Sequence, residues 1–341
     1  MRPSRLAPAA LLAAALLLTA CGSNGTTDPT SDGSAGTGAS SGAGTSAADA
    51  GAFPVTVDTA FGEVTIDEEP QRVVALGWSD AETALALGVE PVGASDWLAF
   101  GGDGVGPWAQ DLYATSPEII STLEPELEAI AALQPDLILD TRSDGTQERY
   151  EALSRIATTV GIPEGAEAYA TTWQEQLELV GEALGRSDEA DDLEDEVEAT
   201  IDAAEEANPQ FDGTTVAVGA RSGQEWGAYT EGDARVQLME QLGFEQSPQV
   251  AELGDDSFYV PVSEERLDLL DADLTVVFPI FVDAATITDD PLYQAIPSVQ
   301  DGRAVVLEDT LSNAFSSLSV LGTRYAVENI TPLLAEAVPA S

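Results

Sequence analysis

Two arginines stand at the ends of predicted strands in a chain that is short of positive charge. The predicted strand 137–140 ends at Arg142, and the predicted strand 215–220 ends at Arg221. Lys and Arg together number 12 against 61 Asp and Glu, and every one of the twelve is an arginine. A guanidinium group donates a fork of hydrogen bonds to oxyanions, and ligands of open α/β sheets bind beyond the carboxyl ends of the strands. The pattern predicts a site for an anionic ligand.

Aromatic side chains follow the same predicted strands, and aromatic faces can cover the rings of a planar ligand. The Gly-rich stretch FGGDGVGPW, 100–108, favours a loop at the rim of such a site. An arginine in so acidic a chain also has a plainer interpretation, since Asp140 or Asp144 could pair with Arg142. The candidate ligand-binding residues are Trp78, Ser79, Trp97, Trp108, Arg142, Arg221, Trp226, Tyr229, Tyr259 and Phe281.

The composition excludes several classes of chemistry. The chain has no histidine and no lysine, so it lacks the imidazole base of Ser-His-Asp and Cys-His enzymes and the lysine of P-loops and Schiff-base enzymes. Zinc sites are built largely from His and Cys. A formal net charge of -49 argues against a nucleic-acid partner, because phosphates repel such a surface. Hydrolysis by paired carboxylates, as in glycosidases, remains open.

The N-terminus predicts a lipid anchor. Arg2 and Arg5 precede the apolar run 6–18, which is too short for a membrane span. Leu-Thr-Ala-Cys follows and resembles the bacterial lipoprotein box, in which the cysteine thiol is lipidated; the alternative is an ordinary secretory signal. We expect residues 1–20 to be a signal peptide and Cys21, the one cysteine, to carry lipid. Residues 21–52 are rich in Gly, Ser, Thr and Ala and predict a disordered tether.

The rest of the chain alternates strand and helix patterns twice. VTVDTAFGEVTI, 55–66, predicts an antiparallel hairpin, and runs such as VVAL and LILD are typical of buried parallel strands. Between the two alternations, an apolar stripe at helical spacing predicts one long helix that stops at Pro209. The predicted fold class is α/β, with two Rossmann-like lobes of mostly parallel sheet joined by this helix and a ligand cleft between them. The expected parts are an N-terminal lobe at 53–185, an interlobe helix at 186–209 and a C-terminal lobe at 210–341.

Several of these segments resemble one family. RVVALGWSDAETALALGVEPVGASD, LEAIAALQPDLIL, RVQLMEQLGF, VSEERLDLLDADLTVVF and AIPSVQDGRAVVLED are similar to iron–siderophore-binding lipoproteins of ABC importers, a group that also holds vitamin B12 and haem binders. The resemblance covers about residues 60–335. It implies two lobes on a rigid helix with limited hinge motion, a ferric siderophore held in the cleft, and no cofactor or catalysis. It also implies a monomer anchored in the cell membrane on its extracytoplasmic side.

The resemblance further implies that one exposed glutamate on each lobe meets the permease of the importer. The matching motifs place these glutamates at Glu128 and Glu265; ordinary acidic residues at helix N-termini would look the same. The siderophore type remains open between catecholate, hydroxamate and carboxylate. Vitamin B12 and haem stay alternatives, because haem can be ligated by tyrosine, and a carboxylate-dependent hydrolase is the alternative from another class. Binding of a free metal ion is disfavoured, since binders in neighbouring families use histidine.

Overall fold

The computed structural model describes residues 53–254 and 257–340. The predicted signal peptide (1–20), the linker (21–52) and the lipidation site Cys21 lie outside these described residues.

The first lobe is built on a sheet of five parallel strands in the order β5-β4-β3-β6-β7. Its central strands are continuous apolar runs because helices and loops cover both faces of a parallel sheet. The predicted hairpin, β1 with β2, is present and packs on β7 and α4. The elements are β1 (Val55–Thr59), β2 (Gly62–Ile66), β3 (Val73–Ala75), α1 (Asp80–Ala86), β4 (Gly93–Ser95), η1 (Gln110–Leu112), β5 (Glu118–Ile120), α2 (Leu127–Ala132), β6 (Leu137–Leu139), α3 (Gln147–Ser154), β7 (Thr158–Val160) and α4 (Trp173–Leu184).

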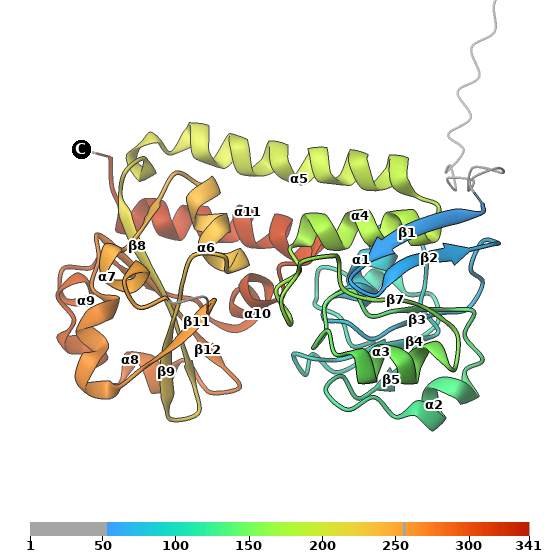
Figure 1. Ribbon diagram of the computed structural model, residues 1–341. Helices are drawn as coiled ribbons and strands as arrows, with labels where there is room; N and C mark the ends of the chain where they lie inside the picture. The colour runs from blue at the N-terminus through green and yellow to red at the C-terminus, as the bar shows by residue number, and fades with distance from the viewer. Residues whose placement is uncertain (1–52, 255–256, 341) are drawn as a thin grey trace, which may run out of the picture. The chain divides into compact units, whose positions relative to one another are not determined.

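One long helix, α5 (Ser187–Ala207), connects the lobes where the sequence predicted it. Before it, α4 begins at a capping box formed by Thr172 and Glu175 and ends at Gly185, whose φ of 64° suits glycine. Figure 1 shows α5 running along both α4 and the last helix, α11 (Val320–Ala337), and α5 packs on both. The predicted architecture of two α/β lobes joined by a long helix is confirmed.

The second lobe carries a mixed sheet in the order β11-β9-β8-β12-β13, with β10 also paired to β8. Strands β10, β8, β12 and β13 run parallel, β9 is antiparallel to β8, and β11 is antiparallel to β9. The elements are η2 (Pro209–Phe211), β8 (Thr215–Ser222), β9 (Glu225–Tyr229), α6 (Ala234–Gln241), β10 (Glu245–Gln246), α7 (Pro248–Ala251), β11 (Tyr259–Val262), η3 (Glu264–Leu270), β12 (Leu274–Ile280), α8 (Ala285–Thr288), η4 (Tyr293–Ala295), α9 (Pro297–Gln300), β13 (Ala304–Val306) and α10 (Asp309–Ser317), followed by α11.

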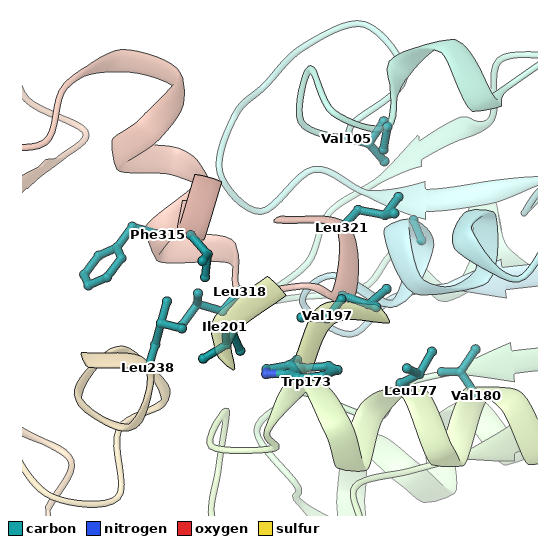
Figure 2. Packing of buried hydrophobic residues seen from close by; sticks show 14 of the residues in the cluster. Val105, Trp173, Leu177, Val180, Val197, Ile201, Leu238, Phe315, Leu318 and Leu321 are labelled. Atoms are coloured by element: carbon teal, nitrogen blue, oxygen red, sulfur yellow. The ribbon is translucent and has the colours of Figure 1, made fainter. Parts of the chain in front are cut away.

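A continuous apolar core joins the two lobes. One cluster of buried residues runs from Val57 in β1 to Leu334 in α11. Figure 2 shows its centre, where Trp173 of α4, Val197 of α5 and Leu318, between α10 and α11, lie in one group. Helices α1 and α4 of the first lobe also pack on α11. None of the helices within the described residues is both long and apolar enough to cross a membrane.

Candidate functional site

Many of the non-glycine residues with a left-handed backbone conformation lie in the loops at the carboxyl ends of the strands. Within the described residues, seven residues other than glycine have a left-handed φ, and six of them lie in loops after strands or at the α10–α11 junction. Such a residue costs about 1–3 kcal/mol and is found most often at functional sites. The six residues are Ser79, Ala99, Tyr169, Phe281, Asp309 and Leu318. The backbone therefore marks the same edge of the two sheets as the sequence did.

Arg142 is buried at this edge without a carboxylate partner. Its side chain is 4% exposed; Nε donates to the carbonyl oxygen of Tyr169 (3.1 Å) and Nη1 to that of Ser317 in the other lobe (2.9 Å). Asp140 is instead held by Arg149, through bonds of 2.8 and 2.7 Å. Burial, and after it the nearby charge of Arg235, lower the pKa of Arg142 to about 10, against the opposing charges of Asp233 and Asp80.

Two consequences follow for Arg142. The plainer interpretation, an ion pair with Asp140 or Asp144, is wrong: Asp140 serves Arg149, and Asp144 accepts hydrogen bonds from Thr146. Among the ten arginines that the structure describes, only Arg142 and Arg72 form no ion pair with a carboxylate, and Arg72 is exposed. Arg142 is thus a buried cation in a very acidic protein. Its third guanidinium nitrogen, Nη2, makes no hydrogen bond to any described residue.

Arg235, at the start of α6, faces Arg142 from the second lobe, and the sequence analysis did not find it. Its guanidinium is clamped by Asp233, with Nε–Oδ1 at 2.8 Å and Nη2–Oδ2 at 2.7 Å, and lies 4.0 Å from the ring centroid of Tyr229. Burial lowers the pKa of Arg235, but the Asp233 charge and hydrogen bonds outweigh burial and raise it above its usual value. The one signal in the sequence that could have drawn attention to Arg235 is Asp233, which caps the N-terminus of the short helix α6.

Arg221 and Trp226 require a correction. The turn at Gly223, with φ of 62°, folds β8 back into β9, and Arg221 pairs opposite Trp226 in this hairpin. Arg221 forms a salt bridge with Asp290, and its guanidinium lies 5.0 Å from the ring centroid of Trp226. Trp226 is 1% exposed and belongs to a buried apolar cluster with Ile287 of α8 and Tyr293 of η4. Both residues therefore stabilise the second lobe, and we remove them from the ligand site.

Three aromatic rings form a stack beside Arg142. Trp78 lies between Trp97 and Tyr169, with ring centroids 4.3 Å apart on each side. Both faces of Trp78 are thus covered by protein, and its Nε1 is buried without a hydrogen-bond partner in the described part of the chain. A ligand ring could stack only on the outer members, Trp97 and Tyr169, which are half-buried. Tyr169 was not predicted.

Ser79 and Trp108 bind protein groups. The hydroxyl of Ser79, 5% exposed, lies 3.1 Å from that of Ser317 in the second lobe. Trp108 donates from Nε1 to Oε2 of Glu82 at 2.8 Å, and its ring packs on Tyr325 of α11 with centroids 5.5 Å apart. The polar atom of Trp108 is therefore bonded within the protein, and the placement of its ring in the cleft stays a prediction.

A cavity of about 700 Å³ opens between the two sets of loops. Phe281, one of the candidate ligand-binding residues, is 71% exposed and lies in the wall of this cavity. Tyr229 is 4% exposed, and the guanidinium of Arg235 covers its ring. Tyr259 is half-buried, and its ring centroid lies 5.2 Å from that of Tyr229. The full lining is Leu98 and Ala99 from the first lobe, with Pro279, Ile280, Phe281, Val282, Asp283, Ala284, Ala285, Thr288, Glu308, Asp309, Ser312, Asn313 and Ser316 from the second.

Two buried carboxylates that the sequence analysis missed organise these loops. Asp80, fully buried, accepts from the backbone N–H groups of Gly77 and Thr141 at 2.9 and 3.1 Å and from Nε2 of Gln176 at 2.7 Å. Burial raises the pKa of Asp80 to about 6, against the opposing effect of these bonds. Glu82, 2% exposed, lies between the lobes. With 61 acidic residues in the chain, no sequence signal distinguishes these two.

The two predicted docking glutamates are exposed. Glu128 lies in the first turn of α2, and Glu265 lies in the first turn of η3 on the other lobe. Within the described ranges, no group of three or more His, Cys, Asp or Glu side chains is placed to hold a metal ion.

The model of the periplasmic binding protein family matches residues 73–311. The chain belongs to this family. A relative from Bacillus subtilis, "Probable siderophore-binding lipoprotein YfiY", is 29% identical over 265 residues, which are 72% of this chain and 77% of the relative. The Fe(3+) dicitrate-binding periplasmic protein FecB of Escherichia coli is 30% identical over 197 residues, covering 53% of this chain and 58% of FecB. Two further relatives from Bacillus subtilis are named as substrate-binding lipoproteins of ABC transporters.

Solved structures of binding proteins share the fold. A periplasmic solute-binding protein from Mycobacterium smegmatis superposes with a TM-score of 0.73 at 27% identity, over 83% of this chain and 98% of that one. Streptococcus pneumoniae PiaA, solved with ferrichrome, gives a TM-score of 0.70 at 27% identity and the same coverage. The family resemblance stated from the sequence is therefore confirmed.

Proposed function

We propose that this binding protein captures an anionic ferric siderophore between its lobes and delivers it to the permease of an ABC importer. The observation that carries the proposal is Arg142, a buried arginine that forms no ion pair with any carboxylate among the described residues, in a chain with 61 acidic residues. An unneutralised buried cation is costly to a fold, and an anionic ligand would balance it. Arg235 on the opposite lobe adds a second donor.

The surrounding groups support a bulky organic chelate. Trp97 and Tyr169 offer outer ring faces, and the adjacent cavity of about 700 Å³ falls in the usual range for small-molecule sites. Relatives named for siderophores and for ferric citrate support the same ligand class. In this proposal the iron arrives already chelated, and the protein supplies no cofactor and no catalysis.

The proposal includes an anchor and a docking surface. Lipid on Cys21 would hold the protein on the extracytoplasmic face of the cell membrane, and Glu128 and Glu265 would contact the permease as the monomer docks. Intact mass of the detergent-extracted protein tests the anchor. A mature chain that starts elsewhere than Cys21, or carries an unmodified thiol, would remove the localisation.

Quenching of intrinsic tryptophan fluorescence tests the ligand class, because Trp78, Trp97 and Trp108 lie at or near the cleft. The panel is ferric dicitrate, ferric enterobactin, ferrichrome, haem and cobalamin. We expect the anionic ferric chelates to bind more tightly than the neutral ferrichrome. Tighter binding of haem or cobalamin than of every ferric chelate would instead assign the protein to another ligand, and no quenching by any member would overturn the proposal.

A further inference from the structure

The α10–α11 junction of the second lobe is inserted into the first lobe. Ser317 and Ser319 are fully buried, and Leu318 between them is 1% exposed with φ of 42°. The carbonyl oxygen of Ser317 accepts from Nη1 of Arg142, and its hydroxyl lies 3.1 Å from that of Ser79. The hydroxyl of Ser319 accepts from the N–H of Gly322 and so caps α11. This segment is a polar connection between the lobes, separate from α5.

Glu82 binds this segment from the first lobe. Its Oε2 accepts from the hydroxyls of Ser319 and Ser317, the latter at 3.3 Å, and from Nε1 of Trp108. Its Oε1 accepts from the N–H of Gly106 at 2.8 Å. Glu82 forms no ion pair with any described arginine. A buried carboxylate without a cation opposes folding unless its hydrogen bonds are complete. Here Oε1 has a donor from the first lobe, and Oε2 has donors from both lobes.

Ser317 connects Glu82 to the ligand site. Its hydroxyl bonds Glu82 while its carbonyl oxygen holds Nη1 of Arg142. With Nε held by Tyr169 at the same time, two of the three guanidinium nitrogens are fixed and Nη2 is left without a partner among the described residues. The rotamer of Arg142 therefore depends on where Ser317 lies, and Ser317 is held by Glu82.

We propose that Glu82 is a positioning residue for ligand capture: by anchoring Ser317 and Ser319 across the lobes, it presents the free edge of Arg142 to the ligand in a fixed orientation. This inference rests on the proposed function, since it assigns Arg142 to ligand binding. Glu82 itself does not touch the ligand. Its contribution is to remove, before the ligand arrives, the side-chain freedom that an unsupported arginine would lose on binding.

The test compares Glu82→Gln with Glu90→Gln in the full chain. A glutamine at position 82 can keep Gly106 bonded to its oxygen, but its amide group then opposes the N–H of Trp108 and weakens the anchor. Glu90 is a matched control, because it accepts two backbone N–H groups, from Ala114 and Thr115 at 2.9 and 3.2 Å, in the same lobe away from the junction. The probes are ferric dicitrate, which is anionic, and ferrichrome, which is neutral.

The expected result is that E82Q weakens ferric dicitrate by about tenfold, the equivalent of one lost hydrogen bond, while E90Q leaves it unchanged. Combined with Arg142→Ala, E82Q should add little further weakening, because the residue it positions is gone. Ser317→Ala keeps the carbonyl oxygen that binds Arg142 but loses the hydroxyl that binds Glu82, so it should weaken binding by a smaller factor. This variant tests the same connection if E82Q fails to fold. Equal affinities of E82Q and wild type, or the same tenfold loss with Arg142 already absent, would overturn the inference.

Amide hydrogen exchange of the ligand-free proteins separates this inference from the proposed function. If Glu82 anchors the junction, exchange at Leu318 and Gly322 should be faster in E82Q than in E90Q, with no ligand required. If the wild-type protein binds none of the chelates, the proposed function fails. Amide hydrogen exchange still tests whether Glu82 anchors the α10–α11 junction. Equal exchange at the junction in the two variants would overturn the anchor whatever the ligand results are.

Discussion

Arg142 and Arg221 occupy comparable places in the two lobes, yet their charges are balanced differently. Arg142 lies just after β6, and Arg221 is the last residue but one of β8. In the first lobe, the nearby Asp140 is taken by Arg149, and Arg142 keeps its charge without a carboxylate. In the second lobe, Asp290 neutralises Arg221. The comparison teaches that a position at the end of a strand does not make an arginine a ligand contact; the placement of the carboxylates decides.

The second lobe contributes a different arginine, in a different electrostatic state. Arg235 faces the cleft with Asp233 bound to it, so the pair carries no net charge. Arg142 of the first lobe is buried and forms no ion pair with a described carboxylate, although the charges of Asp233 and Asp80 act on it. Attraction for an anion should therefore come mainly from the first lobe, and Arg235 should act chiefly as a hydrogen-bond donor.

The largest expected effect concerns Asp80, which holds the first lobe's strand-end loops. Its pKa is raised from 3.8 to about 6 in the folded protein, so the folded state binds the proton more tightly than the unfolded chain does. The free energy of unfolding should then fall as pH rises from about 4 to 6, by about 3 kcal/mol from this residue. Urea unfolding at pH 4 and at pH 7 gives the difference in unfolding free energy between the two pH values. This difference should be smaller in Asp80→Asn than in wild type by that amount. An unchanged difference would show that Asp80 does not titrate in this range.

Arg142→Ala should weaken binding of ferric dicitrate or ferric enterobactin by about ten- to a hundred-fold, since a charge-assisted hydrogen bond contributes about 1.5–3 kcal/mol. Binding of ferrichrome should change less, because a neutral chelate gains no charge interaction. Fluorescence titration measures both. Equal losses for the anionic and the neutral chelates would mean that Arg142 shapes the cleft and does not balance ligand charge.

Arg221→Ala is the matched change in the second lobe and should have the reverse profile. Removal of the arginine leaves Asp290 unpaired at a site where the two side chains are 9% and 11% exposed, which should lower the free energy of unfolding by about 1–2 kcal/mol after allowance for partial solvation. Affinity for ferric dicitrate should stay within about twofold. A large loss of affinity at full stability would return Arg221 to the site and break the comparison between the lobes.

The smallest effect on binding is expected from the double substitution of Glu128 and Glu265 by alanine. Both side chains are exposed, in first turns on opposite lobes, and make no contact with the cleft residues described above. Ligand affinity should not change, whereas uptake of the iron chelate by cells should fall because the permease loses its two contacts. A fall in affinity would place these glutamates in the ligand site.

The sequence predicted the fold well because its signals were local. The apolar runs of β3 and β6 and the single stripe of α5 each follow from neighbouring residues. The β8–β9 hairpin was missed because its turn carries a single glycine, Gly223, and not the stronger Asn-Gly or Asp-Gly pair. Trp226 therefore lies in a strand and not in the loop where it was expected. Arg235, Glu82 and Asp80 were missed because their roles depend on partners far along the chain, such as Ser319 for Glu82.

The core that continues from β1 to α11 has a consequence for how such a protein can change. Because the two lobes share one set of buried side chains, they should melt together as one cooperative unit, with a single calorimetric peak and no stable isolated half. Exchanging a whole lobe with that of a relative would expose mismatched apolar surfaces at α4, α5 and α11. The exposed positions of the loops after the strands, such as Phe281, lie outside that shared interior, so new ligand preferences can arise there by small substitutions while the helical layer stays constant.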